Sequence, residues 1–251
     1  MLPLSFKPKY KCELIRIGSK NDGGYLVEKQ SFIKSKFLIG VGINDDWKFE
    51  KEFKKPFIGI DDQISYKFLV KKIFLNFFSF FSLSFSNRII QSIKKLFDFH
   101  NLRQNFIRSI LSNYHDPKKG VVSLEGILND RSLNNDLNDI FLKIDIEGSE
   151  YRILSDILKL QNNFSGIVIE FHDIDIHQKT IEKFISEIDL DLVHIHSNNF
   201  AGIDKKGDPL VIELTFSKHS KKINNNIELP NKLDTPNNIN KKEINLKFNK
   251  S

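Results

Sequence analysis

The sequence has almost no cysteine: among its 251 residues only Cys12 carries a thiol. A single cysteine excludes an internal disulfide framework and a zinc site built from cysteines, and it fits a reducing compartment. The start of the chain also lacks the pattern of a secretion signal, because Lys7 and Pro8 come before any apolar stretch of useful length. We therefore expect a cytoplasmic protein.

Long hydrophobic runs are absent as well. The longest uncharged run extends from Ile73 to Asn87 and is shorter than the ~20 residues that a membrane-spanning helix needs. Its polar residues recur at helical spacing and its phenylalanines fill the other positions, which predicts an amphipathic helix. Phe and Leu recur every three or four positions over the wider region 66–115. We expect a Phe-rich helical insertion there.

Charge of one sign does not dominate either. The formal net charge is +6, from 38 basic and 32 acidic residues. Basic charge attracts nucleic acid or anionic membranes, but so small an excess favours an ordinary solvated surface. With 40% hydrophobic residues, a chain of this length can bury a sizeable core. We expect a domain over residues 1–219 and a loosely ordered Asn/Lys-rich tail over 220–251.

Short apolar segments alternate with helical patterns along this domain. Strands are expected at 12–17, 25–27, 36–43, 57–61, 121–123, 140–145, 166–171, 192–196 and 210–216. Helices are expected at 46–54, 150–160 and 178–188. This alternation favours a mostly parallel sheet that is covered on both faces. The connection 197–209 is too short for a helical crossover, so the last two strands are expected to be antiparallel.

Glycines and an acidic residue end two of the expected parallel strands. Gly40 and Gly42 close one strand, and Asp61 closes the next, about twenty residues after Gly40. Glycine lets a backbone approach a ligand, and an acidic residue at that place can bind both ribose hydroxyls of a nucleoside. Asp45 stands where a pyrophosphate would prefer a third glycine, which favours S-adenosylmethionine over NAD. The alternative is that the two glycines serve only a tight turn.

Carboxylates and imidazoles gather at three later strand ends. In chain order they are Asp145, Glu147, Glu170, His172, His194 and His196. Charge in a buried parallel strand is costly unless it is paired or used, and ligands bind at the carboxyl ends of such strands. These groups could deprotonate a hydroxyl acceptor or hold a divalent metal, and both uses stay open. The alternative is that Asp145 or Glu147 caps the following helix, with Glu150 in its first turn.

Residues 141–154 read Phe-Leu-Lys-Ile-Asp-Ile-Glu-Gly-Ser-Glu-Tyr-Arg-Ile-Leu. They resemble the signature of the FkbM-type S-adenosylmethionine-dependent methyltransferases, typically K-[IV]-D-[IV]-E-G-x-E. Further segments are similar to other parts of that family, from about residue 12 to about 217: Arg16-Ile-Gly18 with Asp22-Gly-Gly-Tyr25, Gly40-Val-Gly42 with Asp46-Trp-Lys-Phe49-Glu50, Val168-Ile-Glu170-Phe-His172, and His194-Ile-His196-Ser-Asn198-Asn199.

The resemblance implies a Rossmann-like class I methyltransferase fold of the α/β class. Its seven-stranded sheet would be mostly parallel with an antiparallel last strand, and residues 66–115 would be a helical insertion. It also implies O-methylation of a hydroxyl on a sugar, a glycan or a small metabolite. Nucleic acid is disfavoured as the substrate, because the sequence holds no Asn-Pro-Pro-Tyr-like tetrapeptide of the kind that amino-methylating enzymes use.

The strand ends and the resemblance together give a set of expected site residues. For binding S-adenosylmethionine they are Gly40, Gly42, Asp46 and Asp61. For catalysis they are Asp145, His172 and Glu147, and for the acceptor pocket Glu170, His196 and Asn198. If a divalent metal takes part, its expected ligands are Asp145, Glu147, Glu170 and His172.

A different class of function competes with this hypothesis. The chain could be a non-catalytic or membrane-peripheral module that uses the region 66–115. Its phenylalanines are flanked by Lys67, Lys71, Lys72, Arg88, Lys94 and Lys95. We favour the interpretation that these phenylalanines pack onto the sheet. An NAD-dependent enzyme is a further rival, against which the missing third glycine and the carboxylate-rich strand both argue.

Overall fold

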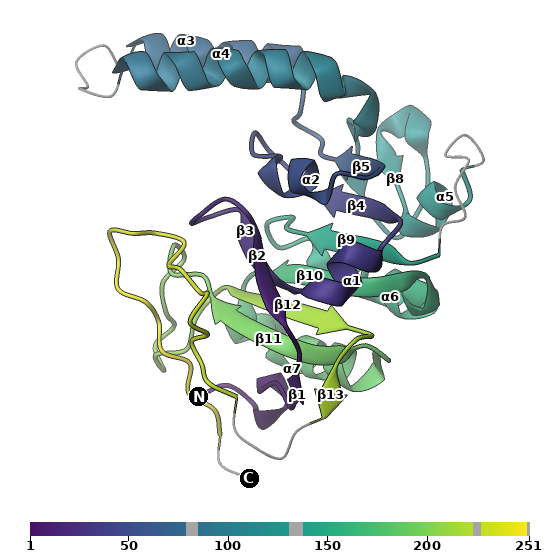
Figure 1. The fold of residues 1–251 in the computed structure, drawn as a ribbon, viewed down its shortest axis with the longest axis vertical. Coiled ribbons are helices and arrows are strands. Elements are labelled where there is room, and N and C mark those ends of the chain that lie inside the picture. Colours follow the sequence, from purple (N-terminus) through teal and green to yellow (C-terminus); the bar gives the residue numbers. More distant parts are fainter. Residues whose placement is uncertain (79–84, 131–137, 223–226, 250–251) are drawn as a thin grey trace.

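A seven-stranded sheet forms the centre of the protein (Figure 1). The computed structural model describes residues 1–78, 85–130, 138–222 and 227–249. The strand order in the sheet is β11-β12-β10-β9-β4-β5-β6. The bounds are β4 Phe37–Val41, β5 Phe57–Ile60, β6 Phe106–Ile107, β9 Ile140–Ile144, β10 Phe164–Phe171, β11 Asp191–Ser197 and β12 Ile212–Ser217. β12 alone runs in the direction opposite to the other strands of this sheet, so the expected mostly parallel sheet with an antiparallel last strand is confirmed.

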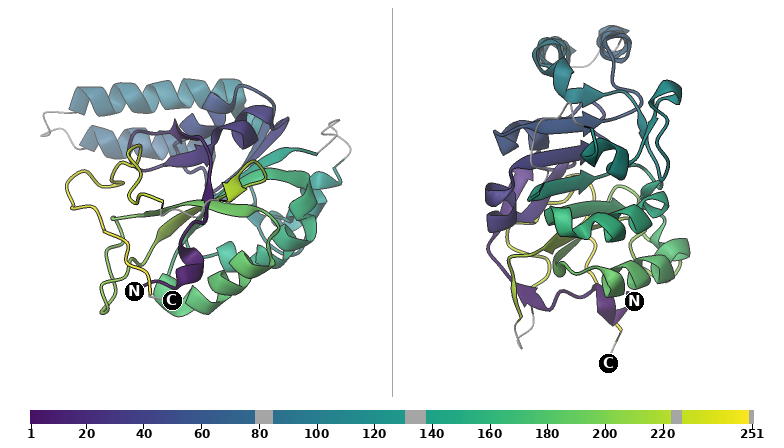
Figure 2. Two further views of the ribbon diagram at one scale, coloured as in Figure 1. Left: turned by 60° about the horizontal axis from the view of Figure 1, so that its bottom comes forward. Right: turned by 90° about the vertical axis from the view of Figure 1, so that its right-hand side faces the viewer.

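Helices cover both faces of the sheet. Successive residues of a buried strand point to opposite sides, so a strand that is apolar throughout has two apolar faces to cover. Leu38, Phe141 and Val168 pack with the helices α1 (Lys29–Lys34) and α2 (Lys48–Phe53). Ile39 and Leu142 pack on the other face. That face is covered by the helices α5 Leu124–Leu128, α6 Leu154–Leu160 and α7 Ile174–Glu187 (Figure 2).

An N-terminal β-hairpin lies over the α1 and α2 side of the sheet (Figure 1). Its strands are β2 (Leu14–Gly18) and β3 (Gly24–Glu28), joined by a tight turn in which Gly24 N donates to Asn21 O. Every residue of β3 is buried, and the strand packs against β10 and β12. The hairpin thereby brings Tyr25 to the sheet. A short strand β1 (Tyr10–Lys11) pairs with β13 (Lys221–Lys222).

The strand expected at 121–123 lies outside the main sheet. β8 (Val121–Val122) pairs with β7 (Ile110–Leu111) in a separate two-stranded sheet. The seventh strand is instead β6, inside the region 66–115 that was expected to be helical throughout. This expectation was wrong because a two-residue edge strand is too short to show a period of two.

Two long helices of the insertion, α3 (Tyr66–Phe78) and α4 (Phe85–Leu102), form a hairpin that projects beyond the sheet (Figures 1 and 2). At its base, Leu69 and Phe99 pack with Trp47 of the main domain. The expectation that the phenylalanines pack onto the sheet is wrong for Phe74 and Phe97, which are 61% and 68% exposed. Residues 79–84 of the expected amphipathic helix, Phe80 and Phe81 among them, lie outside the described residues.

The tail from residue 227 to 249 is attached to the sheet, which corrects the expectation of a loosely ordered segment. Asn199 Nδ2 donates to the carbonyl oxygens of Asn238 and Lys241, at 3.0 and 3.2 Å. Ser197 Oγ donates to Ile244 O at 2.8 Å. Carboxamides and backbone carbonyls satisfy each other here, so a polar composition does not prevent a fixed path. None of the helices in the described residues is long and apolar enough to cross a membrane.

Candidate functional site

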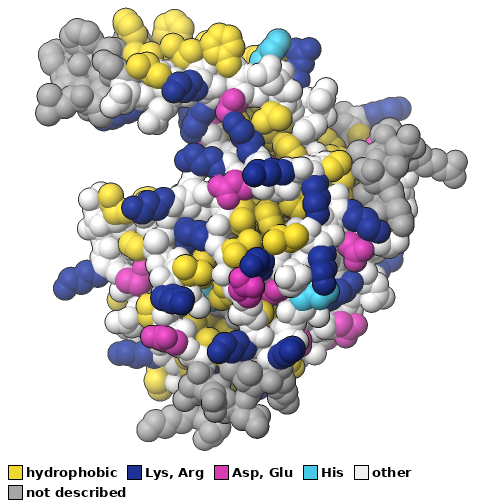
Figure 3. All heavy atoms as spheres, in the orientation of Figure 1, with side chains coloured by type: hydrophobic (Ala, Val, Ile, Leu, Met, Phe, Trp, Pro, Cys, Tyr) yellow, Lys and Arg dark blue, Asp and Glu magenta, His cyan; other side chains and the backbone are white. Residues whose placement is uncertain are grey.

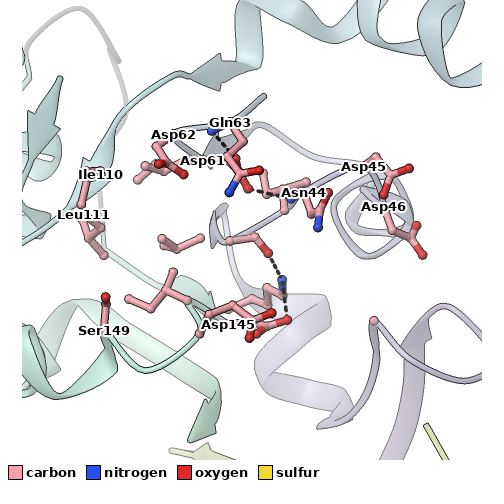
Figure 4. Close-up of a pocket in the computed structure, with 18 of the residues that line it drawn as sticks. Asn44, Asp45, Asp46, Asp61, Asp62, Gln63, Ile110, Leu111, Asp145 and Ser149 are labelled. Carbon is pink, nitrogen blue, oxygen red and sulfur yellow. Dashed lines mark hydrogen bonds and ion pairs between the residues drawn. The ribbon is translucent and has the colours of Figure 1, made fainter. Parts of the chain in front are cut away.

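A cavity of about 680 Å³ opens where β4, β5 and β9 end (Figure 4). Its floor includes Val41 and Ile60, the last residues of β4 and β5, and one wall carries Ile110 and Leu111 of β7. The carboxyl ends of parallel strands are the usual ligand-binding edge of an open α/β sheet. The cavity therefore lies where the sequence predicted a cofactor site, and its volume suits a small molecule.

The cavity is strongly acidic. Among the described residues that line it, seven carry a carboxylate: Asp22, Asp45, Asp46, Asp61, Asp62, Asp145 and Glu147. Three carry a positive charge: Lys95, Lys143 and Arg152. An excess of carboxylates favours a cationic ligand and opposes an anionic one such as a pyrophosphate.

Asp61 lies at the end of β5 and organises the loop beside it. Its Oδ2 accepts a hydrogen bond from the backbone N–H of Asn44 at 2.7 Å, and its Oδ1 accepts from Gln63 N and Ile64 N. Figure 4 shows Asp61 and Asn44 side by side at the cavity. Each carboxylate oxygen has two lone pairs, so Oδ2 can still accept from a ligand hydroxyl. Asp61 thus lines the cavity and also fixes the loop that follows β4.

The two glycines of β4 have different surroundings. Gly42 lines the cavity with φ at +71°, and a Cβ there would lie 1.5 Å from Asp145 O. Gly40 does not line it: a Cβ at Gly40 would lie 2.5 Å from Glu50 Oε1. Glycine at position 40 therefore makes room for the side chain of Glu50 and not for a ligand, contrary to the expectation.

Glu50, on α2, is almost completely buried, and neither of its carboxylate oxygens has a hydrogen-bond partner among the described residues. Burial raises the pKa of this carboxyl, although the charge of Lys143 opposes that effect. Asp46, which precedes α2, lies at the cavity and accepts a hydrogen bond from Ser19 Oγ. Position 46 is thus available to a ligand, whereas position 50 is enclosed.

Asp145 lies at the cavity with Tyr25 behind it. The hydroxyl of Tyr25 is 2.9 Å from Asp145 Oδ2 and 3.1 Å from Glu170 Oε2. Lys143 Nζ donates to Gly42 O at 2.8 Å and lies 4.0 Å from the same Oδ2 of Asp145. Both neighbours approach Oδ2, so Oδ1 is the oxygen that can take a proton from a bound ligand.

Glu170 is buried and does not line the cavity, although it belongs to the same cluster. Burial first, and then the charges of Asp145 and Glu213, raise its pKa well above the usual value, whereas a hydrogen bond from Asn198 Nδ2 at 2.7 Å opposes the rise. The protonated form of Glu170 is therefore favoured more than in an exposed glutamate. In that form its carboxyl group can donate to Tyr25 Oη, which leaves the tyrosine proton for Asp145. Glu170 and Asn198 were both expected in the acceptor pocket, but neither lines the cavity, and they support Asp145 through Tyr25 instead.

His172 joins the other side of this cluster. Its Nδ1 is 2.9 Å from Glu150 Oε1, and its Nε2 is 3.4 Å from Glu147 Oε2 and 3.8 Å from Glu170 Oε1. Burial alone would lower the pKa of His172, but the hydrogen bond to Glu150 and the charges of Glu150, Asp145 and Glu147 raise it. His172 is thus better suited to holding a proton between carboxylates than to removing one from a ligand.

Three of the four expected metal ligands come together. One ligand atom from each of Asp145, Glu147 and His172 lies within 4.8 Å of the others. Carboxylate oxygens with an imidazole are a donor set that divalent metals accept, and the contact between His172 Nδ1 and Glu150 would orient the ring. Glu170 is not part of this group, because its oxygens are turned toward Tyr25 and Asn198.

The helix-cap alternative holds for Glu150, which lies in the first turn of the helix η5 (Glu150–Arg152), but not for Asp145 or Glu147. Glu150 Oε1 accepts from the backbone N–H groups of Ile146 and Gly148, at 3.2 and 3.1 Å, so it closes the loop that follows β9. The helical turn η5 (Glu150–Arg152) has no side-chain cap from its N-cap residue Ser149. Asp145 and Glu147 therefore stay available at the cavity, where both are found.

His196 lies away from the cavity. It is buried between Glu213 and Glu243, with Nδ1 and Nε2 each 3.3 Å from a carboxylate oxygen. The neighbouring His194 is 2.9 Å from Asp234 of the tail. Neither histidine lines the cavity, so the expectation that His196 belongs to the acceptor pocket is not met. Both hold the tail on β11.

Several contributors were not expected to be site residues, namely Tyr25, Lys143, Glu150 and Asp45. Tyr25, Lys143 and Glu150 belong to the segments that resemble the FkbM-type family, so a signal was present. No sequence signal indicated the role of Asp45. Its carboxylate is paired with Lys72 and Lys95 of the helical hairpin, at 2.8 and 2.9 Å. Such pairing depends on how the hairpin docks, which no local pattern encodes.

Comparison with known proteins identifies the family of this chain. A search of curated proteins found no significant match. The family model described as the methyltransferase FkbM domain matches residues 48–200, which is more than half of the 251-residue chain. The matched range begins after Gly42 and Asp46 and contains Asp61, the β9 signature and His172. The chain therefore belongs to the FkbM methyltransferase domain family.

Proposed function

We propose that the protein is an S-adenosylmethionine-dependent O-methyltransferase that acts on a hydroxyl of a sugar, a glycan or a small metabolite. The observation that carries this proposal is the acidic cavity at the ends of β4, β5 and β9. S-adenosylmethionine is cationic at its sulfonium and amino groups, so seven carboxylates against three basic residues suit it. The same charges disfavour NAD and nucleic acid.

The residues present fit this cofactor. Asp61 Oδ2 can accept from a ribose hydroxyl while it holds Asn44 N. The apolar side chains of Ile110 and Leu111 on the wall can contact an adenine ring, and Asp22 and Asp46 can compensate positive charge. When bound, S-adenosylmethionine supplies an electrophilic methyl group for attack by a hydroxyl oxygen.

The chain's own residues then orient the acceptor and manage its proton. Asp145 Oδ1 takes the proton from the attacking hydroxyl, while Tyr25 and Lys143 hold Oδ2. Glu170, whose pKa is raised by burial and by nearby carboxylates, keeps Tyr25 oriented toward Asp145. His172 and Glu147 remain at the edge of the acceptor side, where they position the hydroxyl directly or through a divalent metal. Positioning of this kind supplies much of the rate gain in a two-substrate transfer.

Calorimetric titration of the purified protein with S-adenosylmethionine, S-adenosylhomocysteine and NAD tests the cofactor. We expect saturable binding of the first two only. Asp61→Ala should weaken it by about tenfold or more, since it removes a charged hydrogen-bond acceptor. Asp204→Ala is a matched control, because Asp204 also holds backbone N–H groups of a loop, at 2.7 and 2.9 Å, but lies outside the cavity. Folded protein that binds neither adenosyl compound would overturn the proposal.

A radiolabelled methyl-transfer screen over sugars, glycans and small hydroxyl compounds tests the reaction. It is run with Mg²⁺ and with a chelator, which decides between the direct and the metal-assisted role of the cluster formed by Asp145, Glu147 and His172. Asp145→Asn should lower turnover by about a hundredfold, while the affinity for S-adenosylmethionine changes little. Label transferred to nitrogen, or turnover unaffected by Asp145→Asn, would contradict the assigned chemistry.

A further inference from the structure

The α3–α4 hairpin exposes a row of apolar side chains on each of its helices. On α3 they are Tyr66, Val70, Phe74 and Phe77, and on α4 they are Ile90, Ile93 and Phe97. Residues three or four positions apart share one face of a helix, so each row is a stripe. Figure 3 shows hydrophobic side chains gathered along the side of the hairpin that points away from the sheet. We call these seven residues the outer face.

Lysines border the outer face. Lys67 and Lys71 follow Tyr66 and Val70 by one position, and Lys94 follows Ile93. One position is a rotation of about 100°, so each lysine lies beside an apolar stripe, and all three are exposed. The sequence between Asp62 and Asp98 contains no Asp or Glu. The border of the outer face is therefore cationic, without compensating acidic residues on these helices before Asp98.

Most of the outer face takes no part in docking the hairpin on the domain. Tyr66 is the exception, because its ring centroid lies 5.1 Å from that of Phe99 at the base. The base of the hairpin is held from the opposite side, where Leu69 and Phe99 pack with Trp47. Three ion pairs add to this base: Asp45 with Lys72 and Lys95, and Lys51 with Asp98 at 2.7 Å. Phe74 and Phe97 are not among these contacts, and an exposed apolar area of this kind marks an interaction site.

We propose that the outer face binds the surface of an anionic lipid bilayer. An apolar stripe bordered by lysines is the arrangement of a helix that lies in a membrane interface, with apolar side chains in the acyl boundary and ammonium groups at the phosphates. A second copy of the chain is the less suitable occupant. A two-fold contact would place the outer face on itself and bring lysine borders of equal charge together.

Binding of the outer face to a bilayer fixes the position of the cavity relative to that bilayer. Lys95 lines the cavity and is paired with Asp45 of the loop after β4. The helix that carries Ile93 and Phe97 thus reaches the cofactor side of the site within one turn. The inference rests on the hairpin itself and not on methyl transfer, so it can be tested separately.

Flotation of the full-length protein with lipid vesicles is the test. Vesicles of phosphatidylcholine with phosphatidylglycerol should retain the protein, and pure phosphatidylcholine should retain about tenfold less, because each lysine near the surface contributes to binding. Two double variants, Phe74→Ser/Phe97→Ser and Lys67→Glu/Lys71→Glu, should each reduce retention by about tenfold or more. The control is Ile176→Ser/Lys179→Glu on α7, where Ile176 is 73% exposed, and it should bind like the parent protein.

Trp47 checks that every variant keeps its hairpin docked. It is the single tryptophan, it is buried, and its ring centroid lies 6.2 Å from that of Phe99. Its emission should be the same in the parent protein and in all variants. With emission unchanged, absence of binding to anionic vesicles by the parent protein overturns the proposal. The proposal is also overturned if both outer-face variants bind anionic vesicles as well as the parent protein. It is overturned too if the parent protein binds no vesicles but forms a dimer in sedimentation equilibrium that becomes a monomer in those variants.

Discussion

The hydroxyl of Tyr25 lies 2.9 Å from Asp145 Oδ2, although the two residues are 120 positions apart in the chain. The N-terminal hairpin carries the tyrosine onto the sheet, and β9 ends at the aspartate. Lys143 Nζ lies 5.6 Å above the same tyrosine ring. Tyr25 is therefore fixed from several sides, and it holds the one carboxylate of the cavity that we assign as proton acceptor.

Tyr25→Phe should lower turnover while sparing the cofactor. A hydrogen bond to a charged group contributes about 1.5–3 kcal/mol, so we expect a loss of about tenfold to a hundredfold in kcat. The dissociation constant of S-adenosylmethionine should stay within about twofold, since Tyr25 does not line the cavity. Tyr114→Phe, at an exposed tyrosine, is the control. A variant with full turnover would mean that Tyr25 has only a packing role.

Glu170→Gln should flatten the dependence of stability on pH. The pKa of Glu170 is raised well above 4.5 by burial, Asp145 and Glu213, so the folded state keeps a proton that the unfolded state releases. Folding is then progressively less favourable as pH rises above about 4.5. Glutamine cannot titrate and retains a donor toward Tyr25. Thermal unfolding between pH 4.5 and pH 8 should therefore show a smaller loss of Tm for Glu170→Gln than for the parent protein.

The control for that series is Glu187→Gln, at a partly exposed carboxylate 3.8 Å from Lys183. It should follow the parent protein. If Glu170→Gln is instead destabilised equally at every pH, Glu170 is ionised in the folded state, and the proposed orientation of Tyr25 is wrong.

His196 should give the opposite pH dependence. Burial alone would lower its pKa, but Glu213 and Glu243 outweigh burial and raise the pKa to about 10 from the usual 6.5. The protonated histidine stabilises the fold fully below pH 6.5, and this stabilisation is lost as pH rises toward about 10. His196→Gln should lower the free energy of unfolding by a few kcal/mol at pH 6 and by much less at pH 10.

Urea denaturation at several pH values measures this difference. His219→Gln, at an exposed histidine, is the control and should match the parent protein throughout. A loss of stability in His196→Gln that is the same at pH 6 and pH 10 would show that the ion pairs with Glu213 and Glu243 contribute nothing.

Gly40 and Glu50 should be energetically coupled. A Cβ at Gly40 would lie 2.5 Å from Glu50 Oε1, so Gly40→Ala alone should cost about 1–3 kcal/mol through overpacking. Glu50→Ala removes the obstructing atoms, and the double variant should recover at least about 1 kcal/mol relative to the sum of the single effects. Glu52→Ala, at an exposed glutamate on the same helix, should recover nothing when combined with Gly40→Ala.

Cofactor binding separates this packing role from a ligand contact. The Gly40→Ala/Glu50→Ala protein should bind S-adenosylmethionine about as tightly as the parent protein, because neither residue lines the cavity. A loss of affinity that persists in the double variant, at restored stability, would return Gly40 to the cofactor site.

Much of the sheet and part of the site could be predicted from sequence because the signals are local. Buried parallel strands are continuous apolar runs, and Asp61 and Asp145 follow such runs directly. The same logic placed His196 at the site and failed, because β11 lies at the sheet edge where the tail covers it. Equal positions at strand ends do not give equal access to a cavity that opens where β4, β5 and β9 end.

The sequence by itself determined most of the strands of the main sheet, the family signature at 141–154 and the amphipathic nature of the hairpin, since each depends on neighbours within a few residues. Tertiary structure alone decided that Tyr25 supports Asp145, that Gly40 accommodates Glu50 and that Asp45 joins the hairpin to the cofactor loop. These contacts join residues that are distant in the chain or belong to different elements. Their geometry follows from how whole layers pack, which no short segment specifies.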